Sequence, residues 1–158
     1  MRHAFSLIEL IVTIGVIAAL LSFSSLNFLT LQHKTTLNEQ LELISSDLRT
    51  QQLKAMSGDT EGSGVFSDYG VYLANNAYIL FHGSTYDPAD SGNYQISLPP
   101  TLNLTDITFA DSQIVFQKGS GEILNFSNSN NTFTISDSAM NQSKIFTLNA
   151  LGVISDIQ

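Results

Sequence analysis

Hydrophobic residues follow two different patterns along this chain, and the change comes near residue 58. Residues 5–31 are almost continuously apolar, and Glu9 is the single formally charged residue among them. A run of about 27 residues is roughly 40 Å long as a helix, which exceeds the roughly 30 Å hydrocarbon core of a bilayer. The pattern therefore predicts a helix whose first half spans a membrane.

The second half of this predicted helix is amphipathic. Its apolar residues are spaced four, three, four and seven positions apart, as expected for one stripe along a helix. They are Leu37, Leu41, Ile44, Leu48 and Ala55. Gly58 follows where a glycine after the helix C-terminus is expected. We therefore predict that residues 33–57 continue the helix and pack their stripe on a globular domain.

From Gly58 onward the apolar residues alternate with polar ones, which is typical of strands. The stretch "YGVYLANNAYILF" places two apolar runs around Asn75 and Asn76, which favours a tight hairpin. Further strands are predicted at 94–98, 102–109, 113–117, 123–127, 132–136, 144–149 and 153–157. Short strands joined by tight turns indicate one antiparallel sheet or two packed sheets. The predicted fold class is thus α+β, with a long N-terminal α-helix packed on a C-terminal antiparallel β-sheet domain.

Glu9 is the unexpected residue in the apolar run. Placing a carboxylate inside a membrane costs about 2.5–3.5 kcal/mol on insertion scales, so a simple anchor has no need of it. A cleaved signal peptide is an alternative, with "SFS" at 22–24 as its cleavage region, but the apolar run continues beyond this point. Glu9 either reaches the lipid headgroups at the membrane edge or meets a specific partner.

The stretch "AFSLIEL" resembles the N-terminus of type IV pilins and type II secretion pseudopilins. Their precursors have a short basic leader and a small residue, followed by Phe-Thr-Leu-Ile-Glu or a close variant. Ser6 replaces the usual threonine, and Ala4 occupies the position where glycine is usual. The residues in register are Phe5, Leu7, Ile8, Glu9 and Leu10.

This resemblance implies how the chain is processed and assembled. A prepilin peptidase would cut between Ala4 and Phe5 and methylate the new amine of Phe5. Glu9 would then meet the amine of a neighbouring subunit and set the stagger between helices during filament assembly. The expected partners are other pilin or pseudopilin subunits, the prepilin peptidase, the inner-membrane assembly platform and the lipid bilayer.

The resemblance also implies the order of the segments. These are a leader at 1–4, a transmembrane and filament-core helix at 5–32, an amphipathic continuation at 33–57 and a β-rich domain at 58–158. Arg2 precedes the apolar run, so the positive-inside tendency leaves the N-terminus cytoplasmic. The expected location is the inner membrane, crossed once, with the C-terminal domain periplasmic or extracellular and, after assembly, in a pilus or pseudopilus.

Two features indicate a minor subunit. No proline precedes Pro88, whereas major pilins carry one in the apolar helix. The stretches "SDYGVYLANNAYILF", "IVFQKGSGEI" and "IFTLNALGVIS" resemble the strand pair, turn and closing strands of H-type minor pseudopilins. The expected function is therefore a structural subunit of a type IV pilus or a type II secretion pseudopilus. The alternative is a singly membrane-anchored binding or adhesion domain that does not enter a filament.

Composition argues against several other classes of function. The net charge is −8 with six Lys and Arg, which argues against nucleic acid as a partner. The chain has no cysteine, so disulfides, thiolate metal sites and cysteine nucleophiles are excluded. Common nucleotide-binding, hydrolase and zinc-protease motifs are lacking, so we expect neither catalysis nor a cofactor. Asp87 and Asp90 form an acidic loop that either binds calcium or, as we favour, makes an ordinary turn.

Overall fold

The computed structural model describes residues 7–62 and 64–157, apart from the side chains of residues 22–35. The chain divides into two compact units between Thr36 and Leu37, and each is described by itself. The predicted leader at 1–4 and Phe5 lie outside the described residues. Cleavage between Ala4 and Phe5 and methylation of Phe5 therefore stay predictions.

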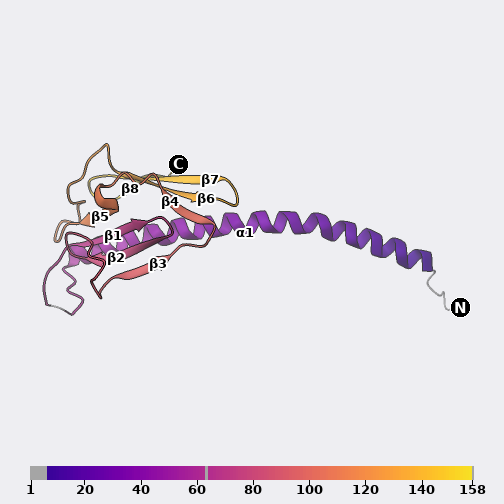
Figure 1. Ribbon diagram of the computed structural model, residues 1–158, viewed down its shortest axis with the longest axis horizontal. Helices are drawn as coiled ribbons and strands as arrows, with labels where there is room; N and C mark the ends of the chain where they lie inside the picture. Colours follow the sequence, from indigo (N-terminus) through magenta and orange to yellow (C-terminus); the bar gives the residue numbers. More distant parts are fainter. Residues whose placement is uncertain (1–6, 63, 158) are drawn as a thin grey trace. The chain divides into compact units, whose positions relative to one another are not determined.

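Helix α1 (Leu7–Ser57) begins in the first unit and ends in the second, where all the strands lie (Figure 1). A short 3-10 helix, η1 (Ala110–Ser112), precedes the fifth strand. The strands are β1 (Tyr69–Ala74), β2 (Ala77–His82), β3 (Tyr94–Ser97), β4 (Leu102–Thr105), β5 (Gln113–Phe116), β6 (Thr132–Asp137), β7 (Gln142–Leu148) and β8 (Ile154–Ile157).

The predicted fold class is wrong in its helical part. Among the described residues, no helix is long and apolar enough to cross a membrane. The side chains of α1 are described over two shorter stretches, 7–21 and 36–57. A membrane span needs about 20 consecutive apolar residues, and the first stretch is shorter than this. The second stretch contains several charged residues, so the described residues of α1 do not include the predicted membrane-spanning first half.

The predicted amphipathic stripe is confirmed within the second unit. All five of its apolar side chains are buried in the core, from Leu37 to Ala55. The helix ends at the expected glycine, because Gly58 has a φ of 72° and donates its N–H to the carbonyl of Lys54 at 3.1 Å. A Cβ at this position would lie 1.6 Å from the Phe66 ring. Glycine is therefore required here both for its backbone angle and for the space it leaves.

The strands form two antiparallel sheets of four strands each. One has the order β3-β2-β1-β5 and the other β4-β6-β7-β8. The pairing of Ala74 with Ala77 leaves Asn75 and Asn76 as the two-residue turn between β1 and β2, which confirms the predicted hairpin. Of the two arrangements that the sequence left open, the structure has two sheets.

Two predicted strands differ in the structure. Residues 123–127 do not form a strand, although Ile123 makes an isolated bridge to Phe116. The left-handed backbone of Asn125, with a φ of 54°, interrupts the extended conformation that a strand needs. The strand predicted at 102–109 ends at Thr105, because Asp106 has a φ of 47°.

One hydrophobic core joins α1 to both sheets in the second unit. Phe133 on β6 and Phe146 on β7 are fully buried partners in the register, and their rings stack with centroids 4.7 Å apart. Tyr78 on β2 is also fully buried, and its hydroxyl donates to the Asp47 carboxylate on α1 at 2.6 Å. This hydrogen bond satisfies the polar end of an otherwise apolar contact between helix and sheet.

Candidate functional site

The most unusual surface of the described chain is the first stretch of α1, residues 7–21. Its large hydrophobic side chains are between 53% and 76% exposed. They are Leu7, Ile8, Leu10, Ile11, Val12, Ile14, Val16, Ile17, Leu20 and Leu21. At 100° per residue these positions surround the helix instead of forming one stripe. A helix that is apolar on all sides is stable where other apolar groups cover it, so this stretch is the candidate contact surface of the described chain.

Glu9 lies in the first turn of α1 and is exposed, between Ile8 and Leu10. An acidic residue in this turn interacts favourably with the positive end of the helix dipole. Its position places a carboxylate at the N-terminal end of the apolar surface. The filament-assembly role predicted for Glu9 stays a prediction, since Phe5, whose amine is the expected partner, lies outside the described residues.

The acidic loop makes the hydrogen bonds of a turn. Asp87 accepts the Ala89 N–H at 2.9 Å, and Asp90 accepts the Gly92 N–H at 2.8 Å. The other Asp90 oxygen lies 3.6 Å from Nε2 of His82. Within residues 7–62 and 64–157, no three acidic, histidine or cysteine side chains gather closely enough to hold a metal ion. The two hydrogen bonds of Asp87 and Asp90 agree with the turn that the sequence favoured.

A groove that the sequence analysis missed lies between α1 and the start of β8. It has a volume of about 230 Å³ and is lined by Ser45, Leu48, Arg49, Gln52, Gly152, Val153 and Ile154. Ser45, Arg49 and Gln52 are spaced by four and three residues, so they form a polar stripe beside the buried one. Both this spacing and a strand at 153–157 were visible in the sequence, but the packing of that strand beside α1 was not.

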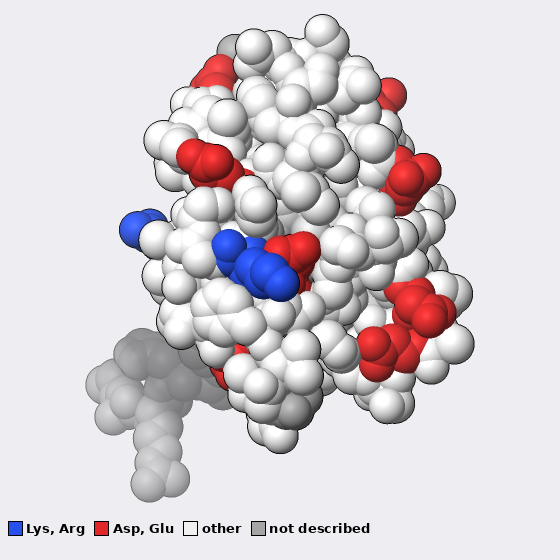
Figure 2. All heavy atoms as spheres, turned by 90° about the vertical axis from the view of Figure 1, so that its left-hand side faces the viewer, with Lys and Arg blue, Asp and Glu red and all other residues white. Residues whose placement is uncertain are grey.

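Acidic side chains dominate the charged surface of the second unit. The face in Figure 2 carries several separate groups of Asp and Glu and few Lys or Arg side chains. Lys54 is paired with Glu61, with 2.6 Å between Nζ and Oε1. An acidic surface of this kind repels phosphate backbones.

Two buried tyrosines should make this unit less stable at alkaline pH. Burial, and then the carboxylates of Glu61 and Asp59, raise the pKa of Tyr69 to about 12. Burial, and then the hydrogen bond to Asp47 and its charge, also raise the pKa of Tyr78. The unfolded chain loses these protons near pH 10, while the folded chain still holds them.

We expect full stability below about pH 10 and a progressive loss as the pH rises from 10 through about 12. Urea unfolding at a series of pH values, followed by circular dichroism, measures this dependence. The variant Tyr69→Phe lacks one of the two phenols and should show a shallower loss of stability. An identical pH dependence in wild type and variant would contradict the assignment to Tyr69.

Comparisons with known proteins return no match: no family model, no curated protein and no solved structure is significantly similar to this chain.

Proposed function

We propose that the protein is a structural minor subunit of a type IV pilus or a type II secretion pseudopilus. The observation that carries this proposal is the apolar surface around residues 7–21 of α1. In the proposed filament, the equivalent helices of neighbouring subunits cover this surface, while the β-rich unit faces outward. The protein then acts through assembly and performs no chemical reaction.

The N-terminal stretch "AFSLIEL" supports this proposal from the sequence. In the proposed pathway, a prepilin peptidase removes residues 1–4 and leaves Phe5 as the methylated N-terminus. Glu9 then becomes the fifth residue of the mature chain and meets the amine of an adjacent subunit. The proposed location is the cell envelope, with the β-rich unit outside the cytoplasm.

An anchored binding domain that remains outside filaments is the competing function. It also explains an apolar N-terminus, but it does not require contacts between the apolar stretches of different subunits. Cross-linking along residues 7–21 therefore separates the two functions.

The absence of native cysteine permits a clean cross-linking test. We expect Ile14→Cys, at an exposed position of the apolar surface, to form disulfides with cysteines placed in the helices of neighbouring filament subunits. Tyr94→Cys, on β3 and 67% exposed, is the control for accessibility alone. The measurement is non-reducing electrophoresis of sheared filaments from cells that contain the assembly machinery. If Ile14→Cys is expressed at the envelope but forms no such disulfide, the filament function is wrong.

A further inference from the structure

The groove between α1 and β8 combines an open strand edge with a free cation. β8 is the last strand of its sheet, and among the described residues no strand pairs with its other edge. Three of its four residues are exposed. The backbone groups along such an edge are available to an added strand, which is a common way for a protein to bind an extended peptide.

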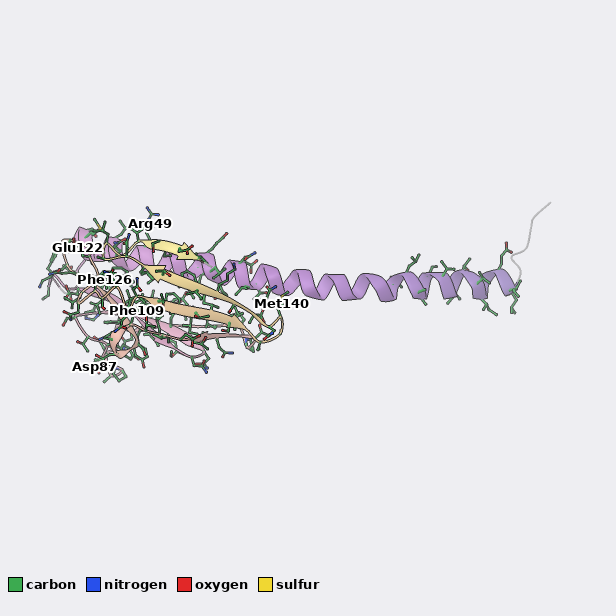
Figure 3. All side chains as sticks on the ribbon, turned by 90° about the horizontal axis from the view of Figure 1, so that it is seen from above. Arg49, Asp87, Phe109, Glu122, Phe126 and Met140 are labelled. Carbon is green, nitrogen blue, oxygen red and sulfur yellow. The ribbon has the colours of Figure 1, made fainter. Side chains whose placement is uncertain are left out.

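Arg49 supplies the charge at this edge. It is exposed on α1, and within the described part of the chain it has no hydrogen-bonding or ionic partner. Figure 3 shows Arg49 on the outer side of α1 next to β8, and both line the same groove. It is the only charged residue in this lining. A free guanidinium presents a planar fork of donors that matches a carboxylate.

The other polar side chains of the groove are already engaged. Ser45 donates its hydroxyl to the Leu41 carbonyl at 2.7 Å. The amide of Gln52 donates to the Gly121 carbonyl at 2.9 Å and to the Leu151 carbonyl at 2.5 Å. These bonds fix the wall of the groove, so Arg49 is left as the side chain that recognises an incoming group.

The apolar contribution comes from the turn before β8. Val153 is 52% exposed and lines the groove, next to Ile154. The Val153 N–H is bound by the Asn149 side chain at 3.0 Å, so this turn is held in place before a ligand arrives. A fixed apolar contact beside an open strand edge favours an alternating apolar and polar peptide.

We infer that this groove binds an extended, acidic segment of another protein. The segment pairs its backbone with the outer edge of β8 where the strand begins, at Ile154, packs an apolar side chain on Val153 and places a carboxylate on the guanidinium of Arg49. This occupant follows from charge complementarity at the lining of the groove, where Arg49 is positive and no residue is negative; the exposed Asp156 lies farther along β8, outside this lining. The inference does not depend on the filament function, because it involves residues of the second unit alone.

The test uses the purified full-length protein and a fluorescent peptide of alternating valine and threonine with one central glutamate. We expect this peptide to bind, and the same peptide with glutamine to bind about tenfold more weakly, because it loses a charge-assisted hydrogen bond. A third peptide, N-methylated on alternate residues along one edge, should not bind, since it lacks the backbone donors for strand pairing. Fluorescence anisotropy measures all three.

Two variants locate the binding site. Arg49→Gln should weaken binding of the glutamate peptide about tenfold and abolish the preference for glutamate over glutamine. Lys118→Gln removes the same charge from an exposed turn that does not line the groove. This variant should bind the glutamate peptide as strongly as wild type does. Equal binding to Arg49→Gln and wild type, or undiminished binding of the N-methylated peptide, would overturn the inference. Self-association that requires Arg49, without peptide binding, would overturn it in favour of a second copy of this chain.

Discussion

Replacing Phe133 with alanine is expected to lower the free energy of unfolding by about 3–5 kcal/mol. Phe133 is fully buried on β6, opposite the fully buried Phe146 on β7. The two rings stack at an interplanar angle of 7°, so the substitution removes an aromatic pair and leaves a cavity in the core. Small domains have about 5–15 kcal/mol of stability in total, so this loss is a large fraction of the total.

Phe66→Ala is the matched control for this prediction. The same side chain is removed, but Phe66 is 46% exposed and lies outside the core cluster, so we expect a loss below about 1.5 kcal/mol. Tyrosine fluorescence during urea unfolding reports on the second unit alone, because all five tyrosines lie between Tyr69 and Tyr94. Similar losses of stability in the two variants would show that the Phe133–Phe146 pair is not the centre of this core.

Local patterns were sufficient for the features whose causes are local. The buried stripe from Leu37 to Ala55 follows from the helical period, and the end of α1 follows from the position of Gly58. The turn at Asn75 and Asn76 follows from residues that favour a two-residue hairpin. In each case the residues that determine the structure lie within a few positions of one another.

The features that were missed depend on distant residues or on single backbone angles. The alternation at 123–127 resembles a strand, but the Ile123 N–H bonds to the Ala150 carbonyl and the Leu124 N–H to the Val115 carbonyl. These tertiary bonds, together with the left-handed Asn125, determine the path of the chain. The groove beside Arg49 forms because β8 reaches α1 from the far end of the sequence. Periodicity within one segment contains no information about such a pairing.

Hydrophobicity alone also led to the wrong description of the N-terminus. The run of apolar residues at 5–31 predicted a membrane-spanning first half, which the described residues do not contain. What they do contain is an apolar surface on every side of the 7–21 stretch. A membrane-spanning segment and an exposed apolar surface both consist of side chains that prefer to be away from water. Of these two features, the described structure contains only the apolar surface.

Replacing Glu9 with glutamine is expected to reduce incorporation into filaments at least tenfold while leaving the amount of protein in the envelope unchanged. Glutamine has nearly the same size and keeps the exposed position in the first turn of α1, but it cannot form an ion pair with the proposed amine of Phe5. A charged pair in an apolar filament core favours one stagger between helices, and a difference of about 1.4 kcal/mol already corresponds to tenfold. Immunoblotting of sheared filaments against total protein measures the incorporated fraction.

Two controls determine whether this effect belongs to assembly. Mass spectrometry of wild type and Glu9→Gln should find the mature chain beginning at Phe5 in both, so that a failure of cleavage after Ala4 is not mistaken for a failure of assembly. Glu39→Gln removes an exposed acid from the second stretch of α1 and should be incorporated like wild type. If Glu9→Gln is incorporated normally, Glu9 does not set the stagger, and the apolar surface at 7–21 must supply the register by shape alone. If Glu9→Gln is not incorporated while Glu39→Gln is, the stagger between helices depends on the charge at one end of that surface. The apolar side chains of the surface are then too uniform to distinguish one stagger from the next.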